Sequence, residues 1–461
     1  MTDPAQSKRA SSSLLRRSFK KILPTAVRGE GVYLWDSEGK RYLDFSGSAA
    51  VNFVGHGVRE ITAAMTEQAG GLEFVHSSQF TSGVAEEYAR ELIEFAGAAF
   101  RGGAVFFTSG GSEAVETALK LARQYQVEVG QTKRFRVLSR KQSYHGATLG
   151  AVAVSGNRRR REIYLPMLRD DTDAHKINTP YCYRCVYGCR NCAAAYAEEL
   201  ERAIHDVEGE AAAFIFEPVS GATLGAAVPP SGYLQRVAEI CRREGVLLIA
   251  DEVMTGMGRT GKNFAVEHWD VAPDIIVAAK GLSSGYAPLG AVIVGKKIED
   301  AIARGSGSLL HGFTYNAHPI AMAAGRAVLS FIKQRQLVSA ADSAVTAGVA
   351  GRLRDGLEQL RSHGCVGDVR GIGLLWGIEF VTNKNTKQPI PPDLNFAGRV
   401  SEAAVRRGLL VYPMQGCADG TQGDHLLIAP PAVITREQVE RSCEQLRESI
   451  DETLLSPPPR N

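Results

Sequence analysis

Two kinds of apolar pattern alternate through the middle of the chain. Unbroken apolar runs occur at 104–107, 213–216, 246–250 and 275–279. Between them, apolar residues return every three or four positions, as in Val115, Ala118, Leu119 and Ala122, and again in Leu234, Val237, Ala238 and Cys241. The runs predict buried strands and the spaced residues predict helices, the second of which should end at Gly245. Apolar strands linked through helices predict an α/β fold with a mostly parallel sheet that is covered on both faces.

The chain is expected to form two domains, because 461 residues exceed what one hydrophobic core usually supports. The strand and helix alternation predicts a large domain over 71–334, with a cysteine-rich loop at 180–193. A small α/β domain is predicted over 335–455, joined by an N-terminal segment at 14–70. The Ser-rich residues 1–13 and the proline tail at 456–461 are expected to be disordered.

An apolar stripe near the N-terminus predicts one further helix that packs on the body or on a partner. It consists of Leu14, Leu15, Phe19, Ile22 and Leu23. The arginine pair at 16–17 superficially resembles an export signal, but no apolar segment follows it. We therefore expect a cytoplasmic protein.

The charge and hydropathy patterns exclude two classes of partner. The net charge of +3 is too small to indicate binding to nucleic acid or to an acidic membrane. The apolar runs have the length of strands and fall far short of the roughly 20 residues that span a bilayer. The expected partners are therefore small molecules.

Three charged residues follow predicted strands directly. They are Glu217, Asp251 and Lys280. Ligands of open parallel sheets bind beyond the carboxyl ends of the strands, so these side chains are expected to share one site. A lysine and a carboxylate there suit pyridoxal phosphate: the lysine forms a Schiff base with the aldehyde, and the carboxylate keeps the pyridine nitrogen protonated. Each residue alone could equally cap a helix or reach solvent.

Residues for the phosphate and the ring lie nearer the N-terminus. The turn at 109–112, Ser-Gly-Gly-Ser, connects a predicted strand to a helix, where N–H groups and the helix dipole favour an anion. Tyr144, in the Tyr-His-Gly stretch at 144–146, is a candidate for stacking on the ring. Such a turn and such a tyrosine are common in any fold, and their value lies in the combination with Asp251 and Lys280.

The ordered set of motifs resembles the class III aminotransferases that depend on pyridoxal phosphate. The motifs lie at 107–114, 143–146, 217–219, 248–261, 279–282 and 311–315. The resemblance covers nearly the whole chain, from about residue 29 to about residue 439. It implies the fold type I architecture, with a large domain that binds pyridoxal phosphate, a small domain and a homodimer with shared active sites.

The resemblance also implies roles for single residues. Lys280 is the Schiff-base lysine and the proton carrier, Asp251 pairs with the pyridinium, and Glu217 is an acidic gate. Val253 and Tyr144 cover the two faces of the ring. Gly111 and Ser112 donate to the phosphate, and Thr314 reaches the phosphate of the neighbouring subunit. For His145, a structural role and the orientation of Tyr144 are both open, and we do not expect it in the catalytic set.

The implied reaction is a ping-pong transfer from an amine or amino acid to an oxo acid such as pyruvate or 2-oxoglutarate. Many relatives hold a substrate carboxylate with an arginine in the C-terminal loop, yet residues 408–431 contain no arginine or lysine. The departure favours a donor of the ω-amino type. Ala49 and Ala50 suggest a roomy pocket. An aminomutase, a decarboxylase, a racemase or a non-catalytic sensor of metal or redox state are the alternatives.

A second departure is a cluster of four cysteines. They are Cys182, Cys185, Cys189 and Cys192. In a reducing compartment, this compact spacing favours a metal over disulfides, with an iron–sulfur cluster ahead of zinc. A redox-sensing dithiol and unligated loop cysteines are the alternatives.

A run of four arginines occupies 158–161. Such a run is usually a solvated face, and contact with a phosphorylated substrate is the alternative.

Overall fold

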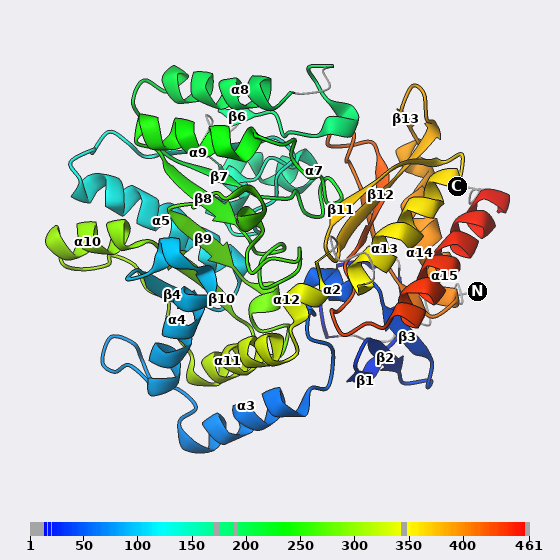
Figure 1. The fold of residues 1–461 in the computed structure, drawn as a ribbon, viewed down its shortest axis with the longest axis horizontal. Coiled ribbons are helices and arrows are strands. Elements are labelled where there is room, and N and C mark those ends of the chain that lie inside the picture. The colour runs from blue at the N-terminus through cyan, green and yellow to red at the C-terminus, as the bar shows by residue number, and fades with distance from the viewer. Residues whose placement is uncertain are drawn as a thin grey trace.

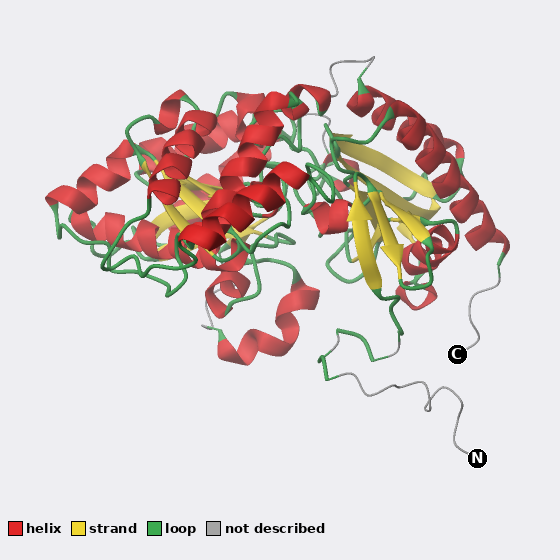
Figure 2. Ribbon diagram, turned by 90° about the horizontal axis from the view of Figure 1, so that it is seen from below, coloured by secondary structure: helices red, strands yellow, loops and turns green. Residues whose placement is uncertain are grey.

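The chain folds into two lobes that lie side by side (Figure 1). The computed structural model describes residues 13–15, 17–19, 21–168, 175–188, 192–342 and 348–456. Figure 2 shows a separate group of strands in each lobe, with helices packed around both groups. The large lobe contains a seven-stranded sheet, and the small lobe contains two smaller sheets.

The sheet of the large lobe is parallel except for one strand, as predicted. Its order is β4-β10-β9-β8-β7-β5-β6, and only β10 runs antiparallel to its neighbours. The strands are β4 (Ala104–Thr108), β5 (Arg136–Arg140), β6 (Lys176–Ile177), β7 (Ala211–Phe216), β8 (Leu247–Asp251), β9 (Ile275–Ala278) and β10 (Gly290–Val294). The four predicted apolar runs thus became β4, β7, β8 and β9 of one sheet.

Both faces of this sheet are buried, which explains why its strands are apolar throughout. In β7, Ala213 and Ile215 pack with α5, whereas Phe214 and Phe216 face the opposite core. The helices of the lobe are α3 (Arg59–Gly71), α4 (Gly83–Ala96), α5 (Gly111–Glu128), α6 (Leu149–Val154), α7 (Arg158–Arg161), α8 (Ala193–Asp206), α9 (Tyr233–Glu244), α10 (Lys296–Arg304) and α11 (Pro319–Gln334). Gly245 ends α9 in the left-handed conformation, as expected.

Short 3-10 turns complete the described elements of both lobes. They are η1 (Ala98–Phe100), η2 (Glu162–Met167), η3 (Cys182–Arg184), η4 (Ala265–Trp269), η5 (Lys280–Leu282), η6 (Gln359–Ser362) and η7 (Pro392–Leu394). The turn η5 matters most for function, because it begins directly at Lys280.

The small lobe joins the two ends of the chain. Its first sheet has the order β1-β2-β3-β14, in which β14 pairs with β3 in parallel. Its second sheet, β11-β12-β16-β15 with β13 beside β12, is antiparallel. The strands are β1 (Ala26–Glu30), β2 (Tyr33–Asp36), β3 (Arg41–Asp44), β11 (Val366–Ile372), β12 (Leu375–Asn383), β13 (Gln388–Pro389), β14 (Leu409–Leu410), β15 (Tyr412–Gln415) and β16 (Asp424–Ile428). The helices are α2 (Gly47–Ala50), α12 (Leu337–Ala340), α13 (Val349–Glu358), α14 (Phe396–Arg406) and α15 (Arg436–Leu455).

The N-terminal stripe does not form the predicted helix. The described residues between 13 and 25 have no helical structure, and Leu14, Phe19 and Leu23 are exposed. A short amphipathic segment gains little from helix formation unless its apolar face is covered, and the part of the chain that the structure describes leaves these three side chains exposed. Within the described residues, no helix is long and apolar enough to cross a membrane.

Candidate active site

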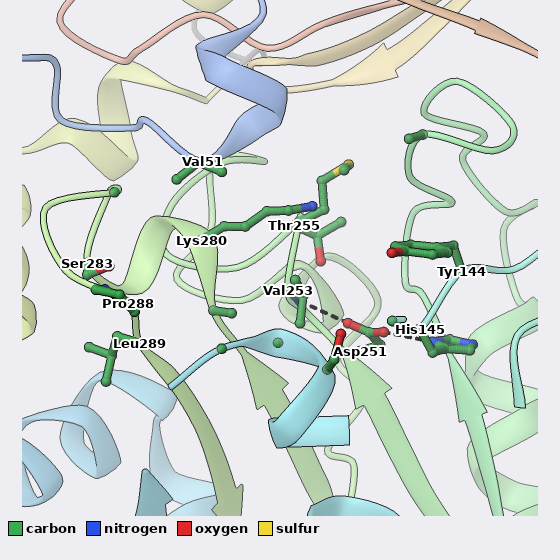
Figure 3. A pocket seen from close by; sticks show the side chains of 18 of the residues that line it. Val51, Tyr144, His145, Asp251, Val253, Thr255, Lys280, Ser283, Pro288 and Leu289 are labelled. Atoms are coloured by element: carbon green, nitrogen blue, oxygen red, sulfur yellow. Dashed lines mark hydrogen bonds and ion pairs between the residues drawn. The ribbon is translucent and has the colours of Figure 1, made fainter. Parts of the chain in front are cut away.

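A cavity of about 470 Å³ opens at the carboxyl edge of the large sheet. Because β7, β8 and β9 are adjacent and parallel, the residues that follow them reach the same edge. Seven of the eight residues predicted for the site line this cavity: Gly111, Ser112, Tyr144, Glu217, Asp251, Val253 and Lys280. Figure 3 shows Lys280 and Tyr144 reaching into it from opposite sides, with Val253 and Asp251 between them.

Lys280 begins the turn that follows β9 and has a left-handed backbone, with φ of 46°. Few residues other than glycine adopt this conformation, so the surrounding structure must hold it. Burial lowers the pKa of the Lys280 amine to about 8, although the carboxylates of Asp251 and Glu217 oppose this shift. At pH 7 about a tenth of the amine is therefore neutral and nucleophilic, far more than for an ordinary lysine.

Asp251 ends β8 and is held by two donors. Its Oδ2 lies 2.7 Å from Nδ1 of His145, and its Oδ1 accepts a hydrogen bond of 3.1 Å from the Val253 amide. Both side chains of the His145–Asp251 pair are buried. Among the described residues, Nε2 of His145 has no hydrogen-bond partner. His145 thus lies at the site and contacts Asp251, a contact that the sequence pattern does not predict.

The turn at 109–112 leads into the N-terminus of α5. Gly110 has an extended backbone and Gly111 is the first helical residue, so the helix end opens on the cavity. A Cβ added at Gly111 would lie 3.2 Å from Cγ1 of Val253, which shows how closely the backbone approaches that side chain. Ser112 Oγ accepts a hydrogen bond of 3.0 Å from the Ala147 amide. The arrangement is typical of a phosphate site.

Glu217 follows β7 and bounds the cavity on the side of Tyr144. Its Oε1 accepts a hydrogen bond of 3.0 Å from the Gly221 amide, and its Oε2 lies 3.4 Å from the Tyr144 amide. Burial raises the pKa of Glu217, and the nearby Asp251 carboxylate adds to this effect against the opposing influence of His145. The carboxyl group can therefore accept or release a proton closer to neutral pH than an exposed glutamate.

A left-handed turn at Gly47–Ala50 carries Val51 to the cavity. Ser48, Ala49 and Ala50 all have φ between 50° and 64°. Asp44 holds this turn, because its carboxylate accepts hydrogen bonds from the Ser48 amide at 2.9 Å and the Ser48 hydroxyl at 2.8 Å. Val51 lines the cavity, whereas Ala49 and Ala50, which suggested a roomy pocket, are not among the lining residues.

Thr314, the eighth predicted residue, is exposed in the connection between α10 and α11. It is not among the residues that line the cavity of its own chain. Its proposed role concerns the neighbouring subunit.

Comparison with known proteins identifies the family. The sequence profile of "Aminotransferase class-III" matches residues 15–450. The chain belongs to the class III aminotransferase family. It is a transaminase that depends on pyridoxal phosphate and has the fold type I architecture of the solved members.

Class III aminotransferases with similar sequences and structures cover almost the whole chain. The "Uncharacterized aminotransferase YodT" of Bacillus subtilis is 38% identical over 443 residues, which are 95% of this chain and 98% of that protein. An amine transaminase from an uncultivated Pseudomonas species, solved in the PLP-bound form, has a TM-score of 0.87 and 34% identity over 96% of this chain and 98% of its own. An (S)-enantioselective omega-transaminase from Thermomicrobium roseum has a TM-score of 0.86 and 34% identity over 97% of each chain.

The site fits the cofactor of these aminotransferases. A lysine whose pKa is lowered, a buried carboxylate fixed by a histidine and an open helix end face one cavity. They match the aldehyde, the pyridine nitrogen and the phosphate of pyridoxal phosphate in chemical type.

The arginine run at 158–161 does not form the solvated face that was expected. Arg158 and Arg159 are exposed, but Arg161 is buried and donates from Nε to the carbonyl of Val152 at 3.0 Å. Arg160 is half-buried, and its guanidinium carbon lies 4.2 Å from the ring centroid of Tyr144. Half of the run thus belongs to the packing behind the site.

The cysteine cluster gains no support from the described geometry. Cys182 is exposed, Cys185 is half-buried and Cys192 is buried, while Cys189 lies outside the described residues. Among the residues that the structure describes, no group of three or more His, Cys, Asp or Glu side chains is placed to hold a metal. The segment that contains Cys182 is anchored to the small lobe, where Arg184 Nε lies 2.6 Å from Oε1 of Glu379.

Proposed function

We propose that this transaminase carries pyridoxal phosphate on Lys280 and moves an amino group from an amine or amino acid to an oxo acid. Pyruvate and 2-oxoglutarate are the candidate acceptors, and the two substrates react in turn by a ping-pong mechanism. The observation that carries the proposal is the amine of Lys280, with its pKa near 8, facing a cavity shared with the His145–Asp251 pair.

Pyridoxal phosphate supplies an electron sink for the substrate carbon that loses its proton. The role of Asp251 is to keep the pyridine nitrogen protonated, and His145 fixes the carboxylate for that task. Lys280 would remove the proton from the donor carbon and return it to the carbon on the other side of the amino nitrogen, which requires a neutral amine close to neutral pH. Glu217, with its raised pKa, is proposed to act as the acidic gate beside Lys280.

The other cofactor contacts follow the same logic. Val253 and Tyr144 would hold the ring from its two faces. Gly111 and Ser112 would bind the phosphate at the N-terminus of α5. We further propose a homodimer in which Thr314 completes the phosphate site of the partner, since Thr314 is exposed and lies outside the cavity of its own chain.

A donor of the ω-amino type is favoured. The C-terminal loop at 408–431 contains no arginine or lysine to hold a donor carboxylate next to the reacting carbon. One of the similar solved structures is named an omega-transaminase. An aminomutase or racemase needs no oxo acid and a decarboxylase releases carbon dioxide, so the products separate these alternatives from a transaminase. A sensor without catalysis would need neither Lys280 nor Asp251.

The test is a panel of amines and amino acids incubated with the holoenzyme and pyruvate, scored by alanine formation. We expect alanine from at least one ω-amine. Lys280→Ala should lower the rate by at least about 10³-fold and remove the visible absorption band of the bound cofactor. Alanine formation at the wild-type rate by Lys280→Ala would refute the assignment of Lys280. Carbon dioxide without alanine would indicate a decarboxylase, and an isomerised product without alanine would indicate an aminomutase or a racemase.

A metal on the four-cysteine segment stays a separate hypothesis, supported only by the spacing of Cys182, Cys185, Cys189 and Cys192. Iron and zinc analysis of anaerobically purified protein tests it. Less than one metal atom per chain would refute it. Iron with a visible charge-transfer spectrum would favour a cluster over zinc.

A further inference from the structure

Arg160 places a guanidinium group against Tyr144, a residue that lines the active-site cavity. Its Cζ lies 4.2 Å from the ring centroid of Tyr144, and Tyr144 itself lines the cavity. Its charge also acts on Lys280: burial lowers the pKa of that amine, the carboxylates of Asp251 and Glu217 raise it, and Arg160 and Arg259 lower it further. The guanidinium is therefore within electrostatic reach of the reacting atoms.

The other arginines around the cavity are already occupied. Arg259 donates to three backbone carbonyls at 2.6 to 3.0 Å. Arg140 donates to the backbone carbonyl that follows β7, and Arg370 is paired with two carboxylates. For Arg160, no carboxylate or carbonyl among the described residues contacts the guanidinium, whose only partner there is the tyrosine ring. A cation whose five N–H donors lack an acceptor is ready to bind an anion.

Arg160 also faces a second cavity, of about 320 Å³, between the two lobes. One wall is formed by Arg159 and Arg160 of α7, and the opposite wall by residues 413–415 of the small lobe. Gln415 joins the walls, because its Oε1 accepts a hydrogen bond of 2.7 Å from Nη1 of Arg159. Arg160 thus lies between the cavity that holds Lys280 and the C-terminal loop that contains no cation of its own.

An oxo-acid acceptor brings a carboxylate into this site. Burying a carboxylate without a cation is costly. Among the described residues that line the main cavity, Lys280 is the only lysine or arginine, and the proposed chemistry requires its amine to be neutral. A positive charge that this chain supplies for the acceptor must therefore come from a residue next to the described lining.

We propose that Arg160 binds the carboxylate of the oxo-acid acceptor and so determines which acceptors the enzyme uses. The inference rests on the proposed function, because it assumes transfer to an oxo acid. The competing role is purely structural, with Arg160 supporting the ring of Tyr144. The two roles differ in one respect, because only the first depends on a negative charge in the substrate.

The experiment compares two acceptors that differ in that charge. The enzyme is loaded with pyridoxamine phosphate, and its single-turnover reactions with pyruvate and with acetaldehyde, which lacks the carboxylate, are followed by absorbance. For Arg160→Met, we expect kcat/KM for pyruvate to fall about 10- to 100-fold and that for acetaldehyde to fall less than about 3-fold. Arg160→Lys, which keeps the charge, should restore part of the pyruvate rate.

Arg158→Met is the matched control, because Arg158 is exposed and its only described ion pair, to Glu162, is exposed as well. A second readout needs no turnover: the dissociation constant of propionate for the holoenzyme should rise about 10-fold in Arg160→Met, and that of propionamide should not.

Each other outcome decides against Arg160. Equal losses for pyruvate and acetaldehyde would assign it to the support of Tyr144, and no loss for either would remove it from the site. If the wild type transfers an amino group to none of pyruvate, 2-oxoglutarate and acetaldehyde, the proposed function itself fails and this inference fails with it.

Discussion

Nδ1 of His145 lies 2.7 Å from Oδ2 of Asp251, and both side chains are buried beside the cavity. The contact joins a loop that also carries Tyr144 to the end of a central strand. It fixes the direction of a carboxylate whose other hydrogen bond among the described residues comes from the backbone amide of Val253.

His145→Ala removes this contact. We expect kcat to fall about 10- to 100-fold and the dissociation constant of pyridoxal phosphate to rise about 10-fold, because a hydrogen bond to a charged group is lost. Steady-state rates and cofactor titration of the apoenzyme measure both. His145→Asn keeps a donor near Nδ1 and should retain more activity. Unchanged cofactor affinity in His145→Ala would show that the contact is dispensable.

Lys280 should titrate far below an ordinary lysine. Burial lowers the pKa of its amine to about 8 from 10.5. Only the neutral amine is nucleophilic, so the rate at which Lys280 of the apoenzyme reacts with trinitrobenzenesulfonate should rise with pH and reach half its maximum near pH 8. The contribution of Lys280 is the difference between the wild type and Lys280→Ala. Asp251 opposes the shift, so Asp251→Asn should move the midpoint to still lower pH. A midpoint near 10.5 would contradict the lowered pKa.

Gly47→Ala tests the left-handed turn that carries Val51. A Cβ at Gly47, where φ is 54°, would lie 2.3 Å from the carbonyl oxygen of Ala429. We expect a loss of stability of more than about 2 kcal/mol and a thermal midpoint several degrees lower. Gly39 is the control, since its φ of 81° is also left-handed but a Cβ there meets nothing within 4 Å. Gly39→Ala should cost only about 1 kcal/mol, and equal losses would mean that space is not limiting at Gly47.

His425 predicts a loss of stability in mild acid. Burial, helped by the charge of Arg370, lowers the pKa of its ring to about 4, while the unfolded chain protonates it near 6.5. Between these pH values the ring is protonated in the unfolded state but not in the folded state. The free energy of unfolding therefore falls as the pH decreases from about 6.5 to about 4. Unfolding midpoints across this window should flatten in His425→Leu but not in His76→Leu, whose histidine is exposed. A slope unaffected by His425→Leu would contradict the prediction.

The same histidine also contacts a residue that lines the cavity. His425 Nε2 lies 2.7 Å from the carbonyl oxygen of Ala222, and Ala222 lines the cavity. Because His425→Leu removes this contact at every pH, we expect its KM for the amino donor to rise across the whole pH range in steady-state assays. An unchanged KM would show that the contact does not shape the cavity.

The sequence was sufficient to predict those site residues that directly follow a strand. Glu217, Asp251 and Lys280 could be assigned to one edge because unbroken apolar runs predict neighbouring parallel strands, and such strands end together. The same periodicity predicted α5 and α9. The turn at 109–112, which is proposed to bind the phosphate, followed from its place between a strand and a helix.

Contacts between loops could not be predicted in this way. The His145–Asp251 bond and the position of Arg160 over Tyr144 depend on how irregular segments fold back, and no periodicity encodes that. The N-terminal stripe had a helical pattern but remains irregular, because amphipathic periodicity predicts a helix only when a surface is present to cover it. The turn at Gly47–Ala50 was also hidden, since Ser48 and Ala49 give no sign of a left-handed backbone.

The pairing of β3 with β14 has a consequence for synthesis. Leu43 is joined to Leu409 in one sheet, and the segment that carries Val51 to the cavity begins a few residues after β3. On the ribosome, the large sheet can assemble while the last fifth of the chain is still missing, but β3 has no β14 to pair with until residues 409–410 emerge. Completion of the pocket, and with it binding of the cofactor, is therefore among the last steps of synthesis and folding. A chain truncated before residue 409 should form the large lobe with an incomplete active site.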